Sequence, residues 1–465
     1  MRNAALLALT LATLLGVAGC GVLEPALPKA DPGIPATWPQ ASQEATAAGA
    51  TAADIGWREF FTDPHLQELI GRALTGNRDL RVAVLNVERV RQLYRVQRAD
   101  RVPSVDAVGA MTRRGGDAGT SETFTADLGV TGFELDLFGR VRNQSEAALQ
   151  RYFAQEEARR SAQLALIAEV ANAYLTLAAD QDQLRVARET LRTREESHTL
   201  TEKRHELGAV SALDVSQSRT LVESARADAA RYAGQVAQDV NALNVLVGSP
   251  IEAALLPAGL SDSVTELDPL PAGLPSTVLL RRPDVLQSEH LLRAANADIG
   301  AARAAFFPSI TLTGAVGSAS SELSSLFDGG TQTWSFIPSI RVPIFEGGRL
   351  RANLGVAKAD RDIALASYEK SIQQAFREVA DSLALESTLA DQRTALAAVV
   401  DAATQAEALS DARYRAGRDS YLTRLDAQRT LYVAQQALIT TRRAEQSNRV
   451  ALFKVLGGGW REHTP

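Results

Sequence analysis

Few residues of this 465-residue chain have the types and spacings that catalysis or metal binding requires. Its single cysteine, Cys20, excludes a disulfide framework and a cysteine-rich metal site. There is no GxSxG motif, no phosphate-binding loop and no pair of carboxylates set against a histidine, so we predict that the chain is not an enzyme. The net charge of −6 offers no basic excess for nucleic acid. The five histidines fall in no metal-ligand spacing; they are His65, His198, His205, His290 and His463.

The position of Cys20 points to a covalent modification. Residues 1–19 contain Arg2 and an apolar run too short to span a bilayer as a helix, which is typical of a signal peptide. The run ends in "VAGC", which resembles the bacterial lipobox; the alternative is an ordinary signal peptide. The resemblance implies that Cys20 carries N-acyl and S-diacylglycerol lipid, with no other cofactor, and Gly21 implies the outer membrane. Residues 20–55 are expected to form an extended Pro- and Ala-rich tether.

After the tether the sequence contains an internal duplication. Asp79 matches Asp284 and Gly109 matches Gly314, each pair being 205 positions apart. Further on, the "DLFGRVRN" and "FEGGRLRAN" segments match at a separation of 209 positions. The period is far longer than a solenoid unit, which indicates a duplicated half-molecule with repeats at 56–260 and 261–465.

Each repeat has two segments with the period-two alternation of a half-buried strand. We expect strands at about 103–112 and 123–137 in the first repeat, and at about 308–318 and 333–345 in the second. One face is apolar and the other is polar, with Asp127 and Arg341 on the polar faces. A soluble four-stranded sheet and part of a membrane barrel both fit this pattern. The membrane anchor, the charged residues suited to a wet lumen, and aromatic residues near the strand ends favour the barrel.

Four strands cannot close a barrel, and unpaired amides at an open edge in lipid cost several kcal/mol each. The barrel interpretation therefore requires several copies of the chain. Two copies would supply eight strands, three copies twelve and four copies sixteen, and this argument does not choose among them.

Two very long helices follow the strand pairs, at about 139–207 and 349–416. The first range contains no proline or internal glycine after its first residue, and a seven-residue row of Val170, Leu177, Leu184 and Leu191 indicates a coiled-coil-like seam. Gly208 and Gly417 lie where the long helices must reverse, and Ser211 and Ser420 are expected to cap the returning helices.

Past the second turn, Leu422, Asp426 and Arg429 have the i, i+4 and i+7 spacing of residues on one helix face. The simplest interpretation of Asp426 and Arg429 is an exposed surface pair, which would stabilise the helix by only a few tenths of a kcal/mol.

Taken together and in order, these segments resemble the TolC-like outer-membrane efflux proteins, specifically the NodT-type lipoprotein branch. The resemblance covers nearly all of residues 56–460, including "GWREFFTDPHLQELIGRALTGNRDLRVA", "ELDLFGRVRN", "PIFEGGRLRANL", "RYRAGRDSYLTRLDAQRTLYVAQQALI" and "VALFKVLGGGW". It implies a homotrimer in which a 12-stranded β-barrel in the outer membrane continues into a 12-helix α-barrel through the periplasm.

The implied function is passive conduction of drugs, organic solutes or metal ions delivered by a periplasmic adaptor and an inner-membrane RND transporter. The resemblance makes Leu422, Asp426 and Arg429 the periplasmic aperture, with Arg429 bonding to a neighbouring helix. It makes the turns at Gly208, Ser211, Gly417 and Ser420 the end that contacts the adaptor. The alternatives are a TolC-type duct for type I secretion and a lipid-anchored structural coiled coil in the periplasm.

Overall fold

The computed structural model describes residues 23–36, 38, 55–117, 119–261, 264–265 and 276–464. They fall into two compact units, which we describe separately. The strand unit comprises residues up to 32, 85–157 and 286–371, and the core unit comprises 33–84, 158–285 and 372–465. Each unit takes segments from both halves of the chain, so packing does not follow the boundary between the sequence repeats.

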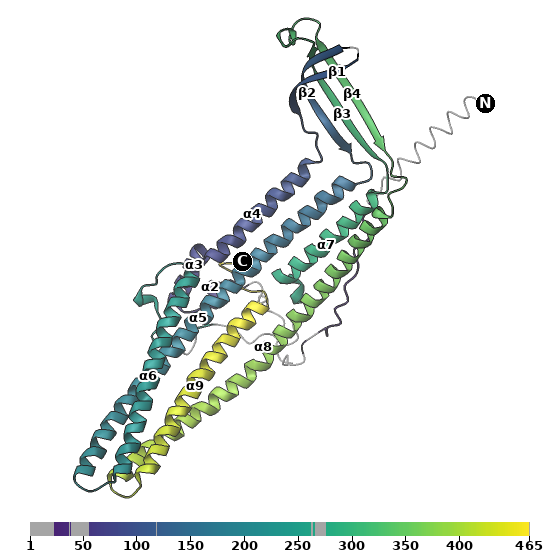
Figure 1. Cartoon of the computed structure of the whole chain (residues 1–465). Coiled ribbons are helices and arrows are strands. Elements are labelled where there is room, and N and C mark those ends of the chain that lie inside the picture. The colour runs from purple at the N-terminus through teal and green to yellow at the C-terminus, as the bar shows by residue number, and fades with distance from the viewer. Residues whose placement is uncertain are drawn as a thin grey trace. The chain divides into compact units, whose positions relative to one another are not determined.

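The strand unit contains one antiparallel sheet in the order β1-β2-β3-β4 (Figure 1). Its strands are β1 (Asp106–Gly116), β2 (Gly119–Leu135), β3 (Ser309–Ser320) and β4 (Gln332–Arg341). Each repeat supplies one hairpin, and β2 pairs with β3 across the repeats. Four strands in a mainly helical chain confirm the expected fold class.

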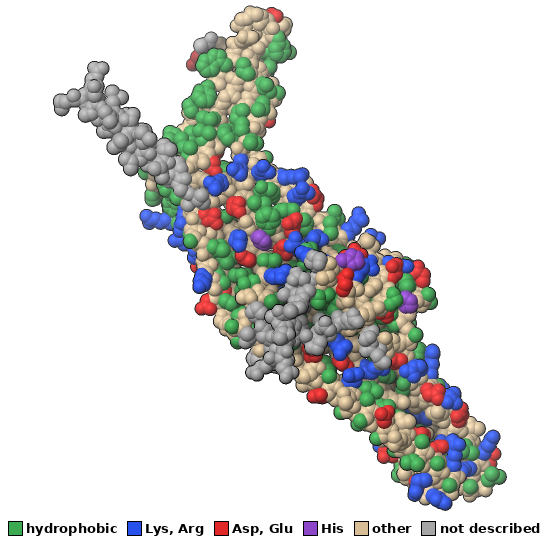
Figure 2. Space-filling model, turned by 180° about the vertical axis from the view of Figure 1, so that it is seen from behind, with side chains coloured by type: hydrophobic (Ala, Val, Ile, Leu, Met, Phe, Trp, Pro, Cys, Tyr) green, Lys and Arg blue, Asp and Glu red, His purple; other side chains and the backbone are tan. Residues whose placement is uncertain are grey.

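The register of the sheet places apolar side chains from several strands on one face. Leu128 of β2 pairs with Val316 of β3, which in turn pairs with Trp334 of β4. On the opposite face Asp127 pairs with Gly317, next to a row of threonine and serine residues. Figure 2 shows hydrophobic side chains gathered over the sheet. One face therefore suits contact with lipid, and the other suits contact with water.

A β-bulge between Val130 and Phe133 keeps this division over the full length of β2. The bulge sets residues 131 and 132 of β2 opposite the single residue Thr313 of β3; without this one extra residue, strict alternation would turn Phe133 to the polar face. Gly132 adopts a left-handed φ of 66°, and its amide donates to Thr313 Oγ1 at 3.0 Å. Beyond the bulge, Phe133 again pairs with an apolar residue, Leu312.

Strand β4 ends at Arg341, four residues before the expected end at 345. Arg341 pairs with Ser309, the first residue of β3, so the ladder offers β4 no further partner residue, which explains the early end. Ile344 and Phe345 then leave the sheet with 94% and 89% of their surface exposed.

Helices make up most of both units. The long helices α5 (Arg140–Glu206) and α8 (Arg349–Arg415) have 67 residues each, or about 100 Å at 1.5 Å per residue. Both contribute to each unit. The other helices are α2 (Trp57–Phe60), α3 (Pro64–Gly76), α4 (Arg78–Ala99), α6 (Ala212–Val247), α7 (Pro283–Ala304) and α9 (Tyr421–Val455), with short 3-10 turns at Ala253–Leu255, Ser276–Arg281 and Leu323–Ser325.

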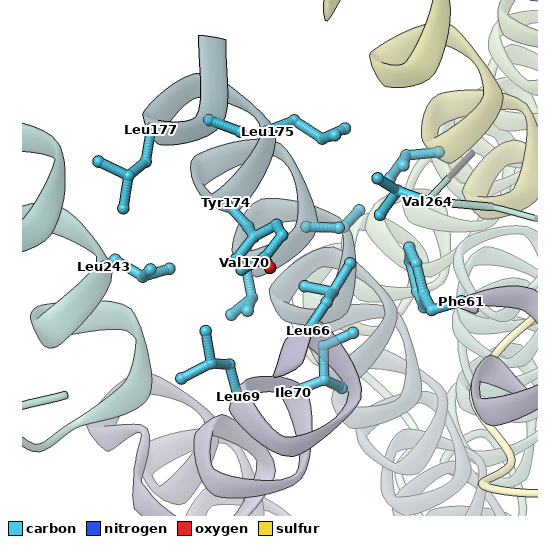
Figure 3. Packing of buried hydrophobic residues seen from close by; sticks show 14 of the residues in the cluster. Phe61, Leu66, Leu69, Ile70, Val170, Tyr174, Leu175, Leu177, Leu243 and Val264 are labelled. Atoms are coloured by element: carbon cyan, nitrogen blue, oxygen red, sulfur yellow. The ribbon is translucent and has the colours of Figure 1, made fainter. Parts of the chain in front are cut away.

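The core unit is built on the apolar row of α5. Val170 and Leu177 of that row are fully buried, and Leu184 is almost so. Figure 3 shows Leu66, Leu69 and Ile70 of α3 beside this row, with Leu243 of α6 nearby. At the start of α3, Asp63 caps the helix and accepts a hydrogen bond from the Tyr174 hydroxyl at 2.8 Å.

The described part of the predicted tether is neither helix nor strand, and it is bound to the chain's own helices. In the strand unit, Arg303 Nη1 donates to the Leu23 carbonyl at 3.0 Å, and Asn296 Nδ2 donates to Glu24 Oε1 at 2.9 Å. In the core unit, Trp38 stacks on Phe376 with ring centroids 5.3 Å apart. The predicted signal peptide and Cys20 lie outside the described residues.

Asp180 of α5 and Asp239 of α6 are neighbouring carboxylates, and their interaction makes the stability of the folded chain depend on pH. Burial, followed by the hydrogen bond and charge of Asp180, raises the pKa of Asp239 to about 6, although Arg443 opposes the shift. The unfolded value is about 3.9. Because the folded state disfavours the ionised form, stability falls as pH rises from about 4 through about 6.

We therefore expect Asp239→Asn to raise the melting temperature at pH 7.5 and to have a much smaller effect at pH 4.5. Glu223→Gln, which changes an exposed carboxylate of the same helix, is the control and should change little. Thermal unfolding followed by circular dichroism across this pH range measures the effect. Equal shifts for Asp239→Asn at both pH values would contradict the assignment.

Candidate aperture and helical turns

The turn between α5 and α6 is closed by backbone and cap hydrogen bonds. Gly208 has a φ of 74°, a left-handed conformation that favours glycine, and its amide donates to the His205 carbonyl at 2.8 Å. Ser211 caps α6 by accepting from the Asp214 amide at 3.2 Å, while the Asp214 carboxylate accepts from the Ser211 amide at 2.9 Å. This reciprocal pair of hydrogen bonds is a capping box, in which Asp214 helps to fix the start of α6.

The turn between α8 and α9 repeats this construction. Gly417 has a φ of 70°, and its amide donates to the Tyr414 carbonyl at 3.0 Å. Ser420 caps α9 by accepting from the Thr423 amide at 3.3 Å. Asp419, at the position before the cap, forms an ion pair with Arg413 at 2.7 Å, which lowers the pKa of the Asp419 carboxyl. One chain therefore presents two turns that share a left-handed glycine and a serine cap, although only the first also has a capping box.

Both turns belong to the core unit and lie at the same end of its helices (Figure 1). The guanidinium of Arg204, in the last turn of α5, lies 4.9 Å from the centre of the Tyr414 ring near the end of α8. The Tyr414 ring in turn lies 5.5 Å from that of Tyr421, the first residue of α9. The four turn residues selected from the sequence thus form one surface of the chain.

The structure places Leu422, Asp426 and Arg429 in the first three turns of α9, as their spacing predicts. All three point away from the chain: Leu422 is 67% exposed, and the Asp426 and Arg429 side chains are 63% and 71% exposed. Arg429 Nη2 donates to Asp426 Oδ1 at 2.7 Å. Within one chain this is a surface ion pair three residues apart, and its neighbour Leu422 is an exposed apolar side chain.

Two buried residues of the same helix were missed by the sequence reasoning. Arg424 and Tyr421 are 5% and 6% exposed, and they lie on the side of α9 that faces the other helices of the unit. The available signal was the spacing, because Arg424 lies two positions from Leu422 and so points to nearly the opposite side of the helix. An arginine is usually assigned to solvent, which hid this signal.

The joints between strands and long helices lie in the strand unit and depend on glycine and paired charges. Gly139 and Gly348 have φ values of 76° and 86° just before α5 and α8. Arg140 pairs with Glu134 across the first joint, and the Phe138 ring stacks on Phe307 with centroids 4.7 Å apart. Glu134, Phe138, Arg140 and Phe307 are among the residues that line a cavity of about 370 Å³. The quoted joint motifs therefore encode a sharp change from strand to helix.

Comparison with known proteins agrees with this architecture. The family model described as "Outer membrane efflux protein" matches residues 69–249 and 274–458, one segment in each repeat. The toluene efflux pump outer membrane protein TtgC of Pseudomonas putida is 51% identical over 441 residues, covering 93% of this chain and 91% of the relative. Outer membrane protein OprJ of Pseudomonas aeruginosa is 44% identical over 446 residues, covering 94% and 92%.

Among solved structures, the open state of the Neisseria gonorrhoeae MtrE outer membrane channel is 40% identical, with a TM-score of 0.87. The match covers 96% of this chain and 100% of that channel. A membrane protein from Pseudomonas aeruginosa is 41% identical, with a TM-score of 0.88. The resemblance to TolC-like proteins is confirmed, and with it the outer-membrane location and the role in efflux. The chain belongs to the outer membrane efflux protein family.

Proposed function

We propose that this chain is the outer-membrane channel of a tripartite efflux system, which passively conducts solutes handed over by a periplasmic adaptor and an inner-membrane RND transporter. The observation that carries the proposal is the register of the sheet. It joins the apolar positions of β2, β3 and β4 into one face and leaves a polar face behind them. Such a sheet separates lipid from a water-filled lumen when it is closed into a barrel.

Closure of the barrel is assigned to three copies of the chain. The outer edges of β1 and β4 have no strand partner within the described residues. Because all neighbours in the order β1-β2-β3-β4 are antiparallel, β4 of one copy can pair antiparallel with β1 of the next. The geometry allows any number of copies, and the family favours three. Three copies supply the twelve strands of the β-barrel and the helices of the proposed 12-helix α-barrel that continues it.

Conduction through such a tube requires a lining and a gate, with no catalytic group. The proposed cargo consists of drugs, organic solutes or metal ions. Relatives named for toluene and antibiotic efflux, at 51% identity, favour organic solutes. Selection among these solutes is assigned to the transporter, because a wide aqueous lining contacts them only weakly.

The proposed lipid anchor is acylated Cys20. Leu23, three residues later, is bound by Arg303 in the last turn of α7, shortly before β3 begins at Ser309. Three residues span at most about 11 Å. This short distance supports a lipid at Cys20 that enters the same membrane as the strands.

The aperture is assigned to the exposed face of α9. Around a threefold axis, Leu422 would form an apolar constriction and Asp426 an acidic ring, with Arg429 free to exchange its bond within the chain for one to a neighbouring helix. The paired turns at Gly208–Ser211 and Gly417–Ser420 are the proposed contact for the adaptor, because they form one exposed end of the core unit.

The aperture predicts the effect of removing its charges. We expect Asp426→Ala with Arg429→Ala to raise the leak conductance of the channel in planar bilayers severalfold, because the bonds that hold the helices together are lost. The matched control is Glu189→Ala with Arg192→Ala, which removes an exposed pair of the same three-residue spacing whose printed contacts all lie within α5. An unchanged low conductance in the aperture variant would refute the gate.

The barrel predicts which strand positions contact lipid. With Leu312→Cys or Phe336→Cys, we expect labelling by an apolar maleimide and protection from a charged one. Ala315→Cys and Ser335→Cys, on the opposite face, should react with the charged reagent. Mass spectrometry of labelled protein in intact outer membranes distinguishes the two faces. Equal reaction of both faces with the charged reagent would indicate a soluble sheet and a structural coiled coil.

A further inference from the structure

The start of α9 has an outward face and an inward face with different chemistry. Leu422 and Asp426 are exposed on the outward face, whereas Arg424 is buried, with 5% of its surface accessible. A fully buried arginine is rare, because removing its charge from water is costly unless the charge is paired and hydrogen-bonded. The inward face of α9 therefore needs an explanation of its own.

The Arg424 guanidinium binds two different helices. Its Nη2 lies 2.7 Å from Asp411 Oδ1 on α8, and its Nη1 donates to Ser197 Oγ on α5 at 2.8 Å. It also lies 5.3 Å from the centre of the Tyr414 ring. All of these residues belong to the core unit. One side chain thus joins three helices close to the turns.

The two polar partners of Arg424 differ in which hairpin carries them. Asp411 belongs to the same α8–α9 hairpin as Arg424, and it also pairs with Arg415 at 2.7 Å. Ser197 belongs to the α5–α6 hairpin. If the two hairpins separate, the guanidinium keeps its counter-charge and loses only the bond to Ser197. The contact between the hairpins can therefore break without leaving an unpaired buried charge.

Tyr421 makes a second contact between the same hairpins. Its side chain is 6% exposed. Burial raises the pKa of Tyr421, and the polar side chains of Ser197 and Thr201 on α5 and Ser218 on α6 oppose that rise, so its hydroxyl lies near both helices of the α5–α6 hairpin. Ser197 of α5 therefore accepts a hydrogen bond from Arg424 and is also a polar neighbour of Tyr421.

The duplicated half of the chain lacks this arrangement. At the separation of 209 residues, Val215 corresponds to Arg424 and Ala212 to Tyr421, while Ala406 corresponds to Ser197. None of these three side chains can form a polar contact. The connection is thus made once per chain, by the helix that carries Leu422, Asp426 and Arg429.

We propose that Arg424 is a positioning residue that latches the α8–α9 hairpin to α5 of the same chain, and so holds the aperture residues in their closed position. Opening breaks the bond from Arg424 to Ser197 while the pair with Asp411 persists. This inference rests on the proposed channel function. It adds a bond within each chain to whatever bonds the copies form with each other at the axis.

The test is single-channel recording of the full-length protein in planar bilayers. Ser197→Ala removes the acceptor on α5 and leaves the Arg424–Asp411 pair intact. We expect it to raise the open-to-closed ratio about tenfold, which corresponds to about 1.4 kcal/mol. Ser197→Thr restores the hydroxyl and should restore the low ratio. Thr199→Ala, whose hydroxyl bonds only to the Glu195 carbonyl of its own helix, is the control and should match the wild type.

Arg424→Leu should also raise the ratio, and the melting temperature of each variant reports whether the fold is retained. If Arg424→Leu does not fold, the three α5 variants decide the question. A Ser197→Ala channel as quiet as the wild type, beside a leaking Asp426→Ala and Arg429→Ala channel, would overturn the latch and leave the channel function standing. Equal leak from Ser197→Thr and Ser197→Ala would also overturn it, because packing alone would then explain the effect. Absence of any conductance in all variants would overturn both proposals.

Discussion

The unpaired backbone groups along the outer edges of β1 and β4 are the constraint on which the assembly of this chain depends. The outer edges of β1 and β4 carry rows of donors and acceptors that have no strand partner in the described part of the chain. In lipid each such group costs several kcal/mol, and no side-chain substitution can satisfy it. The apolar face of the sheet is favourable in contact with lipid, whereas the unpaired amides and carbonyls at its edges are unfavourable there. Association with further copies resolves this conflict, so the sheet is complete only as part of a closed ring.

Much of the fold could be predicted from the sequence, because local periodicity determines it. Period-two alternation located all four strands, and the absence of proline located the two long helices to within a residue at most ends. Errors arose where the pairing partner or a single residue overrides a local pattern. Strand β4 ends early because its partner β3 begins at Ser309, and Gly132 permits the bulge that restores the apolar face of β2. Grouping into units could not be predicted either, since it depends on contacts between residues hundreds of positions apart.

The candidate site likewise has features that local sequence predicts and features that depend on contacts between distant residues. The glycine turns, the serine caps and the exposed face of α9 follow from spacing alone. The partners of the buried Arg424 do not, because Ser197 and Asp411 come from different helices and nothing in their local sequence marks them as neighbours. A polar residue within an amphipathic helix is by default assigned to solvent. Only the packing of four helices near the turns reveals that this arginine is enclosed.

Pairing of β2 with β3 joins the two halves of the chain in a fixed one-to-one ratio. Six separate half-chains would form a ring with sixfold symmetry, in which every hairpin had to be identical. A duplicated chain lowers that symmetry to threefold and creates two classes of hairpin that alternate around the axis. One class is then free to carry moving parts, while the other serves as a fixed frame. The difference between Arg424 and Val215 is the kind of specialisation that only the lower symmetry permits.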